Sequence, residues 1–267
     1  MLLTRCLSWR IIPMNSTDIA RARDAILAAR DVVFLTGAGI SAASGVPVFR
    51  GSGIVWEGKQ AAELANAKAF AADPMLVWSW YLHRRQVVAN ASPNAAHQAI
   101  TAWQPCEGAM KWLLTQNVDD LHERSGSKDV THVHGDLWFN RCTKCGKQRE
   151  DRSLHFDEVP RSPCCDELER PAIIWFGETI SENEWGMMNS AAGFADVIIV
   201  IGSSGVVTTS VRFIERARRA KAIANKLKMF QTQRDLTVIN VNLEDSLINA
   251  DIVLRDRAEV ILPELLQ

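Results

Sequence analysis

The sequence predicts an α/β fold, in which helices cover a parallel β-sheet and a small metal-binding insertion interrupts it. Short apolar runs alternate with stretches of helical periodicity along most of the 267 residues, as in parallel sheets buried on both faces. Four of the six cysteines lie in a charged, turn-rich stretch between about residues 139 and 171. In a reducing compartment such a cluster indicates metal binding rather than disulfide bonds.

The composition excludes several classes of protein. Apolar residues make up 47% of the chain and charged residues 23%, which excludes a mainly disordered, collagen-like or coiled-coil chain. Thirty basic residues face thirty-one acidic ones, for a formal net charge of -1, so no global field attracts nucleic acid or an anionic membrane. The longest apolar runs, such as Val197–Ile201, are far too short to span a bilayer. We expect neither nucleic acid nor a membrane as a partner.

Residues 1–17 are expected to form an N-terminal tail, and its composition is compatible with two cellular compartments. The tail carries Arg5 and Arg10 and no acidic residue, which is compatible with a short mitochondrial presequence. Alternatively, Met14 is the true initiator and the preceding residues carry no signal. We expect a cytoplasmic protein, with a mitochondrial location as the alternative.

Helices are predicted from caps and periodicity. The first begins at an N-cap, Ser16 or Thr17, and continues at helical spacing to Arg30. A second covers Met75–Asn90, and the basic run Arg212–Lys228 fits the solvated face of a third.

Apolar runs bounded by turn residues predict the strands of the parallel sheet, because buried parallel strands are apolar on both faces. These runs are Val32–Leu35, Trp112–Leu114, Ile173–Trp175, Val197–Ile201 and Val238–Val241.

Two glycine turns follow predicted strands. The segment 37–42 reads Gly-Ala-Gly-Ile-Ser-Ala, a form of the dinucleotide-binding fingerprint, and Gly202–Gly205 forms a second turn. In the fingerprint one glycine makes the tight turn and the next lets the backbone approach a pyrophosphate. Glu57 has the offset of the usual ribose-binding acid, but Ser44-Gly45-Val46-Pro47 breaks the helix and no strand intervenes. This departure argues against hydride transfer.

Six motifs in order resemble the sirtuin family of NAD-dependent protein deacylases, and together they cover about residues 20–265. They are Gly37-Ala38-Gly39-Ile40-Ser41 continuing to Phe49-Arg50, Thr115-Gln116-Asn117-Val118-Asp119, His134-Gly135 followed by Cys142-x-x-Cys145, Trp175-Phe176-Gly177-Glu178, Gly202-Ser203-Ser204, and Ile239-Asn240. Many family deacetylases have Asp where this chain has Val48, a difference that we interpret as one of subtype rather than inactivation.

The resemblance implies a Rossmann-like NAD-binding domain, formed by residues 18–138 and 172–267, and a small zinc-binding module at 139–171. Further small-domain helices are expected within residues 50–90. NAD and an acyl-lysine of a protein substrate would meet in the cleft between the domains. The implied cofactor-binding residues are Gly37, Ala38, Gly39, Ser41, Phe49, Arg50, Trp56, Gln116, Asn117, Asp119, Gly202, Ser203, Ser204, Asn240, Asn242 and Ala258.

The family reaction moves the acyl group from lysine to ADP-ribose, releasing nicotinamide and O-acyl-ADP-ribose, and it needs a general base for a ribose hydroxyl. Imidazole suits this step because its pKa lies near neutrality. The family position selects His134, whereas His132 is expected to be structural or exposed. The alternatives are a sirtuin-like mono-ADP-ribosyltransferase and a non-catalytic NAD-sensing module.

A structural zinc needs four closed ligands. Cys142 and Cys145 provide one pair, and Cys165 takes the later position of the family's second pair. Ser162, a poor zinc ligand, takes the earlier position. Either the adjacent Cys164 substitutes, or the site is three-coordinate and weak, or it is lost; two buried free thiols are a further possibility.

The substrate-binding prediction concerns the acyl group. Tyr81, the single tyrosine, and Arg84 lie three residues apart on the predicted helix and therefore share a face. They are similar to the Tyr-x-x-Arg pair of sirtuins that remove succinyl, malonyl and glutaryl groups, since Arg binds a carboxylate and Tyr donates a hydrogen bond. Arg85 points about 100° away and is expected to be exposed. We predict desuccinylase and demalonylase activity with weaker deacetylation, and substrate contacts from Trp175, Phe176 and Gly177.

Overall fold

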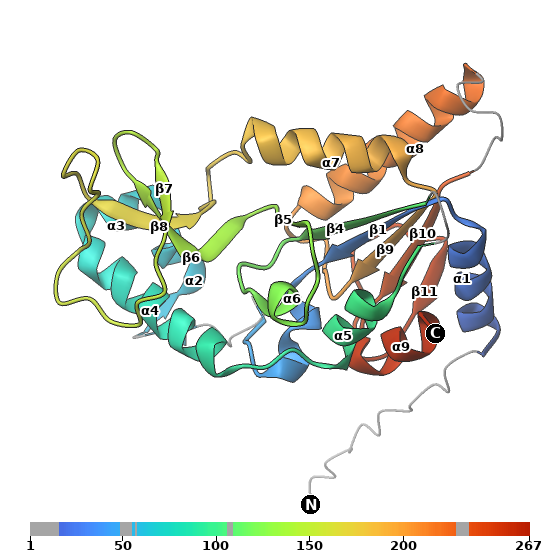
Figure 1. Cartoon of the computed structure of the whole chain (residues 1–267), viewed down its shortest axis with the longest axis horizontal. Coiled ribbons are helices and arrows are strands. Elements are labelled where there is room, and N and C mark those ends of the chain that lie inside the picture. The colour runs from blue at the N-terminus through green and yellow to red at the C-terminus, as the bar shows by residue number, and fades with distance from the viewer. Residues whose placement is uncertain (1–15, 49–54, 57, 106–108, 228–234) are drawn as a thin grey trace, which may run out of the picture.

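The computed structural model describes residues 16–48, 55–56, 58–105, 109–227 and 235–267. Figure 1 shows a large unit built around a parallel sheet and a smaller unit beside it. None of the helices in the described part of the chain has both the length and the apolar character that crossing a bilayer requires.

The large unit is a six-stranded sheet with the order β11-β10-β9-β1-β4-β5, in which every neighbouring pair is parallel. Its strands are β1 (Asp31–Thr36), β4 (Met110–Thr115), β5 (Val130–His132), β9 (Val197–Ile201), β10 (Thr237–Val241) and β11 (Ile252–Leu254). The predicted parallel α/β sheet is therefore confirmed. The edge strands β5 and β11 were not predicted, because each has only three residues. In addition, β5 is half-buried and carries polar side chains, so it lacks an apolar run.

Helices cover both faces of this sheet (Figure 1). Residues Val32 and Phe34 of β1 face the cluster formed with α1, α5 and α9, whereas Val33 and Leu35 face α7 and α8. The helices are α1 (Ser16–Ala28), α5 (Ala95–Ala102), α6 (Leu121–Arg124), α7 (Glu182–Phe194), α8 (Thr209–Lys226) and α9 (Ala258–Leu265). Burial of β1 on both faces explains its continuous apolar sequence.

The smaller unit contains an antiparallel sheet with the order β7-β6-β8. Its elements are β2 (Val55–Trp56), β3 (Lys59–Gln60), α2 (Ala61–Leu64), α3 (Ala67–Ala72), α4 (Pro74–Asn90), β6 (Gly135–Cys142), β7 (Gln148–Glu150) and β8 (Glu169–Ile173). Helix α4 packs on β6 and β8 and confirms the predicted helix. Its apolar side chains form a third core cluster with those of the antiparallel sheet.

The prediction of a parallel strand at Ile173–Trp175 is wrong. Ile173 ends β8, which pairs antiparallel with β6, and Trp175 lies beyond the strand. Strand β8 is buried throughout, and its last residue, Ile173, belongs to the third core cluster. A short apolar run has the same appearance in either kind of sheet, so the sequence pattern did not distinguish them.

Candidate active site

A cleft of about 1310 Å³ opens at the carboxyl ends of the parallel strands, where a ligand of such a sheet is expected. Its walls come from the loops after β1, β4, β9 and β10, from α4, and from the segment that follows β8. The volume exceeds the 300–1,000 Å³ or so of most small-molecule pockets. The cleft is therefore large enough for an extended ligand and a second reactant.

Most of the predicted site residues meet in this cleft. Those that line it are Gly37, Ala38, Gly39, Ser41, Trp56, Tyr81, Arg84, Gln116, Asn117, Asp119, His134, Trp175, Phe176, Gly177, Gly202, Ser203, Ser204, Asn242 and Ala258. Asn240 instead lies buried in β10, where its Nδ2 donates to Ser246 Oγ at 2.8 Å. Its contact with NAD stays a prediction. Phe49 and Arg50 lie outside the described residues.

The two glycine turns cross one another at the floor of the cleft. The Gly39 N–H donates to the Gly202 carbonyl at 2.9 Å. A Cβ on Gly39 would come within 2.6 Å of the Gly202 backbone, and a Cβ on Gly202 within 2.5 Å of the Ile40 nitrogen. Gly202 also has a positive φ of 61°. These glycines are needed because the backbones of the two turns touch.

Hydrogen bonds join the loop after β4 to both turns. Asn117 Nδ2 donates to Ser41 Oγ, and Ser41 Oγ donates to Asp119 Oδ2, each at 3.0 Å. Gln116 Nε2 donates to Ser203 Oγ at 3.0 Å. Burial raises the pKa of Asp119, and hydrogen bonds from Leu121 and Ser41 oppose this shift. The network fixes an amide, a hydroxyl and a carboxyl group at the cleft floor.

The geometry of His134 suits a general base. Its Nδ1 lies 3.2 Å from the Gln116 carbonyl oxygen, and its Nε2 lies 3.2 Å from Thr209 Oγ1. A carbonyl only accepts, so this contact places the proton on Nδ1 and leaves the Nε2 lone pair available. Burial lowers the pKa of His134, which keeps the imidazole neutral. Thr209 was missed by the sequence analysis because no motif marks it.

His132, expected to be structural or exposed, is half-buried and pairs with Glu123. Arg85, expected to be exposed, is completely buried, and this expectation was wrong. Arg85 donates to the Leu137 and Ser153 carbonyls and to Asn140 Oδ1 at 2.9–3.0 Å. Helical spacing gives a direction for the side chain, but it does not reveal that the antiparallel sheet covers that face as well.

Tyr81 and Arg84 line the same end of the cleft. The Tyr81 hydroxyl oxygen accepts a hydrogen bond from Trp175 Nε1 at 2.9 Å. Burial raises the pKa of Tyr81 to about 12, so the hydroxyl keeps its own hydrogen at neutral pH. The half-buried Arg84 guanidinium lies 5.2 Å from the centroid of the Trp80 ring and 5.6 Å from that of the Tyr81 ring. The Tyr81 hydroxyl, a hydrogen-bond donor, and the Arg84 guanidinium, a cation, therefore lie close together beside the Trp80 and Trp175 rings.

Trp175 is held in place by an ion pair that the sequence analysis did not identify. The Arg170 guanidinium lies 3.4 Å from the centroid of the Trp175 ring and donates to Glu178 Oε2 at 2.8 Å. The same carboxylate oxygen accepts from the Trp175 N–H at 2.8 Å. These contacts fix the ring that orients the Tyr81 hydroxyl.

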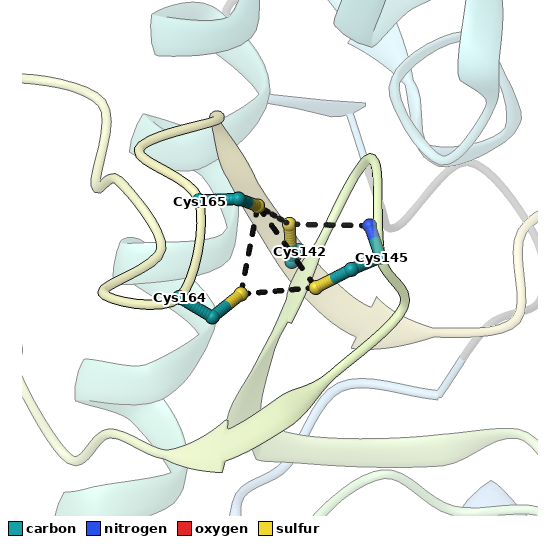
Figure 2. Close-up of side chains that lie close together, drawn as sticks. All are labelled: Cys142, Cys145, Cys164 and Cys165. Carbon is teal, nitrogen blue, oxygen red and sulfur yellow. Dashed lines mark hydrogen bonds between the residues drawn. The ribbon is translucent and has the colours of Figure 1, made fainter.

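The four cysteine thiols converge beside the antiparallel sheet (Figure 2). All four sulfur atoms lie within 4.8 Å of one another; Cys142 and Cys165 are 3.3 Å apart, and Cys145 and Cys164 are 3.0 Å apart. Tetrahedral zinc with Zn–S bonds of about 2.3 Å would separate its sulfurs by about 3.8 Å. Ser162 Oγ lies beside Cys164 Sγ, at 3.0 Å. The thiol of Cys164 therefore lies in one cluster with those of Cys142, Cys145 and Cys165, as a substitute for Ser162 would.

Comparison with known proteins agrees with this geometry. The model of the Sir2 family matches residues 37–209. The NAD-dependent protein deacylase 2 of Pyrobaculum aerophilum is 40% identical over 91% of this chain and 93% of its own. The NAD-dependent protein deacylase of Pseudomonas putida is 38% identical over 94% of each chain. A Sir2 homologue solved in complex with NAD superposes with a TM-score of 0.80 at 37% identity, covering 92% of each chain. The chain belongs to the Sir2 family, the sirtuins.

Proposed function

We propose that this protein is an NAD-dependent protein-lysine deacylase that releases nicotinamide and O-acyl-ADP-ribose. The observation that carries the proposal is the neutral His134, whose Nε2 faces the cleft beside the buried Asn117–Asp119 segment. Similar proteins named NAD-dependent protein deacylase support it. A protein that only binds NAD has no need of a base in this position.

The residues of the cleft fit NAD. Amides and hydroxyls at the strand ends offer donors for ribose and phosphate oxygens, and Asp119 offers an acceptor for hydroxyls. Gln116, Asn117, Ser203, Ser204 and Asn242 would hold the cofactor. NAD would supply the electrophilic ribose carbon and nicotinamide as the leaving group.

The side chains then have separate tasks. Asn117 and Asp119 fix the geometry of the reactants, since Ser41 bonds to both of their side chains. His134 Nε2 accepts the proton of a hydroxyl, while the Gln116 carbonyl stabilises the imidazolium through Nδ1–H. Trp175 and Phe176 line the cleft and would contact the acyl-lysine.

We further propose that the enzyme prefers acidic acyl groups such as succinyl and malonyl. Arg84 would pair with the free carboxylate of the acyl group, and Tyr81 would add the hydrogen of its hydroxyl, which Trp175 orients. Tyr81 is buried and Arg84 half-buried at this end of the cleft, and their partial removal from water would strengthen such a charge-assisted contact.

We also propose that Cys142, Cys145, Cys164 and Cys165 hold one structural zinc ion. A set of four thiolates leaves no open coordination position, as in structural sites. The site lies on the turns that lead out of β6 and into β8. Zinc would therefore stabilise the antiparallel sheet rather than take part in the chemistry.

The test of the proposed function is incubation with NAD and acylated peptides, followed by mass spectrometry. Loss of the acyl mass together with free nicotinamide supports deacylation. A peptide or protein that gains ADP-ribose would contradict it in favour of the transferase alternative, and no change in either would favour an NAD-sensing module.

A further inference from the structure

The His132 side chain connects the end of β5 to the NAD-facing loop. Its Nδ1 lies 3.2 Å from the Asn117 carbonyl oxygen, and its Nε2 lies 2.7 Å from Glu123 Oε1 on α6. Only 13% of the side chain is exposed. We propose that His132 is a positioning residue that holds the Asn117 peptide as an imidazolium, and that Glu123 keeps it in this form. For its effect on turnover this inference rests on the proposed function.

The hydrogen-bond partners of His132 define its charge state. A carbonyl oxygen and a carboxylate oxygen both accept and cannot donate. Either neutral tautomer has one ring nitrogen without hydrogen, which would point a lone pair at one of the two oxygens. The imidazolium alone has the two N–H groups that this geometry needs. His132 is therefore an obligatory double donor, in contrast to the neutral His134.

Charged and titratable groups around His132 favour the same state. Glu123 and His122 face it from α6, Asp119 faces it from the loop after β4, and Asp136 faces it from β6. Burial alone would lower the pKa of His132, but the hydrogen bond and charge of Glu123, with Asp136, outweigh burial and raise it to about 9. His122 stays neutral because burial lowers its pKa well below the ordinary value.

The contact between His132 and the Asn117 carbonyl affects the proposed NAD site because it is one of several hydrogen bonds that fix Asn117. Its N–H donates to Thr115 Oγ1 and its Nδ2 to Ser41 Oγ, each at 3.0 Å. His132 holds the carbonyl oxygen, just as His134 holds that of the preceding residue, Gln116. Loss of the imidazolium leaves one ring N–H for two acceptors, and the Glu123 carboxylate is the stronger of the two. Nδ1 then turns a lone pair towards the Asn117 carbonyl oxygen, and the contact that holds this end of the peptide is lost. The side chain next to NAD then loses its fixed orientation.

The experiment measures NAD affinity by titration calorimetry between pH 6.5 and 10 in three variants of the full-length protein. His132→Gln removes the imidazolium, and Glu123→Gln removes the carboxylate that keeps it charged. His155→Gln is the matched control, because His155 also pairs with a carboxylate, Asp157, at 3.1 Å but is 77% exposed and lies outside the cleft. Thermal melting at pH 7.5 shows whether each variant is folded.

Wild-type protein and His155→Gln should lose NAD affinity as the pH rises through about 9. His132→Gln should bind NAD roughly tenfold to a hundredfold more weakly at pH 7.5, the range expected for a lost charge-assisted hydrogen bond, with no further loss near pH 9. Glu123→Gln should also lack the transition near pH 9, since its imidazole is neutral at lower pH. If His132→Gln does not fold, Glu123→Gln decides the question.

A wild-type affinity that is constant to pH 10, or an unchanged transition near pH 9 in Glu123→Gln, would overturn the proposal. The measurement does not depend on turnover. A wild type that shows the transition but deacylates no peptide would contradict the proposed function while supporting the role of His132.

Discussion

At His134, burial and one backbone carbonyl together select the protonation state that a general base needs. The Gln116 carbonyl accepts from Nδ1–H, and burial lowers the pKa of the ring. Two residues earlier, His132 faces two acceptors and has a pKa of about 9. Two imidazoles of similar sequence context thus differ in charge because their hydrogen-bond partners differ.

Replacing His134 tests the residue that we propose as the general base. His134→Ala should lower the rate of deacylation by about 10²–10⁴-fold, the usual contribution of a general base. NAD affinity should change little, because the groups proposed to hold NAD remain. Single-turnover kinetics and calorimetry measure the two effects. A variant that turns over at nearly the wild-type rate would rule out His134 as the base.

The proposed preference for acidic acyl groups assigns the recognition of the acyl carboxylate to Tyr81 and Arg84. Arg84→Met should lower desuccinylation by roughly tenfold to a hundredfold, because a charge-assisted hydrogen bond contributes about 1.5–3 kcal/mol. Deacetylation should be unchanged or faster. Tyr81→Phe should act in the same direction and also leave the Trp175 Nε1–H without its acceptor. Equal loss of both activities would indicate a structural effect instead.

The adjacent arginine provides a matched comparison. Arg85→Met removes the donor for two carbonyls and for Asn140, and it also removes the cation 3.7 Å from Asp151. Breaking a buried charged contact of this kind destabilises by about 3–5 kcal/mol. We expect a lower midpoint of denaturant unfolding for Arg85→Met and an almost unchanged one for Arg84→Met. The reverse order would contradict the assignment of the two side chains.

At the scale of elements, the cysteine turns hold β6 and β8 together through the proposed zinc ion. Purified protein should contain about one zinc per chain, and Cys164→Ser should lower both the zinc content and the melting temperature. Ser162→Ala is the control, because a serine hydroxyl is a poor zinc ligand. Zinc well below one equivalent in wild-type protein would contradict the proposal, as would a normal content in Cys164→Ser.

The sequence predicted those elements whose environment is uniform. β1, β9 and β10 are buried on both faces, so continuous apolar runs mark them. The predicted helix Met75–Asn90 agrees with α4 except that α4 begins one residue earlier, at Pro74. The run that ends at Trp175 was assigned to the wrong sheet, because pairing partners are distant in the chain and leave no local pattern. Strands β5 and β11 are short edge strands with weak patterns.

In the candidate site, too, residues within local motifs were predicted and residues that depend on tertiary contacts were not. Residues within the glycine turns and the segment 115–119 were predicted because short motifs carry them. Thr209 was not, because its partner His134 lies 75 positions away in the chain. Arg170 and Glu123 were not, because their partners lie eight and nine positions away, a spacing that no helix or strand period marks. The burial of Arg85 likewise depends on the packing of α4 against the antiparallel sheet.

At the scale of the whole molecule, buried histidines predict a stability that depends on pH on both sides of neutrality. Burial lowers the pKa of His97 to about 4, whereas that of His132 is about 9. Unfolded histidine titrates near 6.5, so His97 reduces stability as the pH falls from about 6.5 towards 4. The contribution of His132 is complete below about 6.5 and is lost as the pH rises through 9.

Each of these shifts corresponds to a change on the order of 3 kcal/mol at most. Urea unfolding between pH 5 and 9.5 should therefore give a maximum of the free energy of unfolding near pH 6.5–7. His132→Gln should flatten the alkaline side, and the exposed His155→Gln should not. A free energy of unfolding that is constant over this range in wild-type protein would show that these buried groups do not titrate as inferred.

The most direct test of the proposed deacylase activity and its preference for acidic acyl groups is one competition assay. Wild-type protein is mixed with NAD and equal concentrations of a succinyl-lysine and an acetyl-lysine form of the same peptide, and the products are followed by mass spectrometry. We expect faster loss of the succinyl group, with free nicotinamide and O-succinyl-ADP-ribose formed in equal amounts. Peptides that keep their acyl groups, or acetyl loss that equals or exceeds succinyl loss, would contradict it.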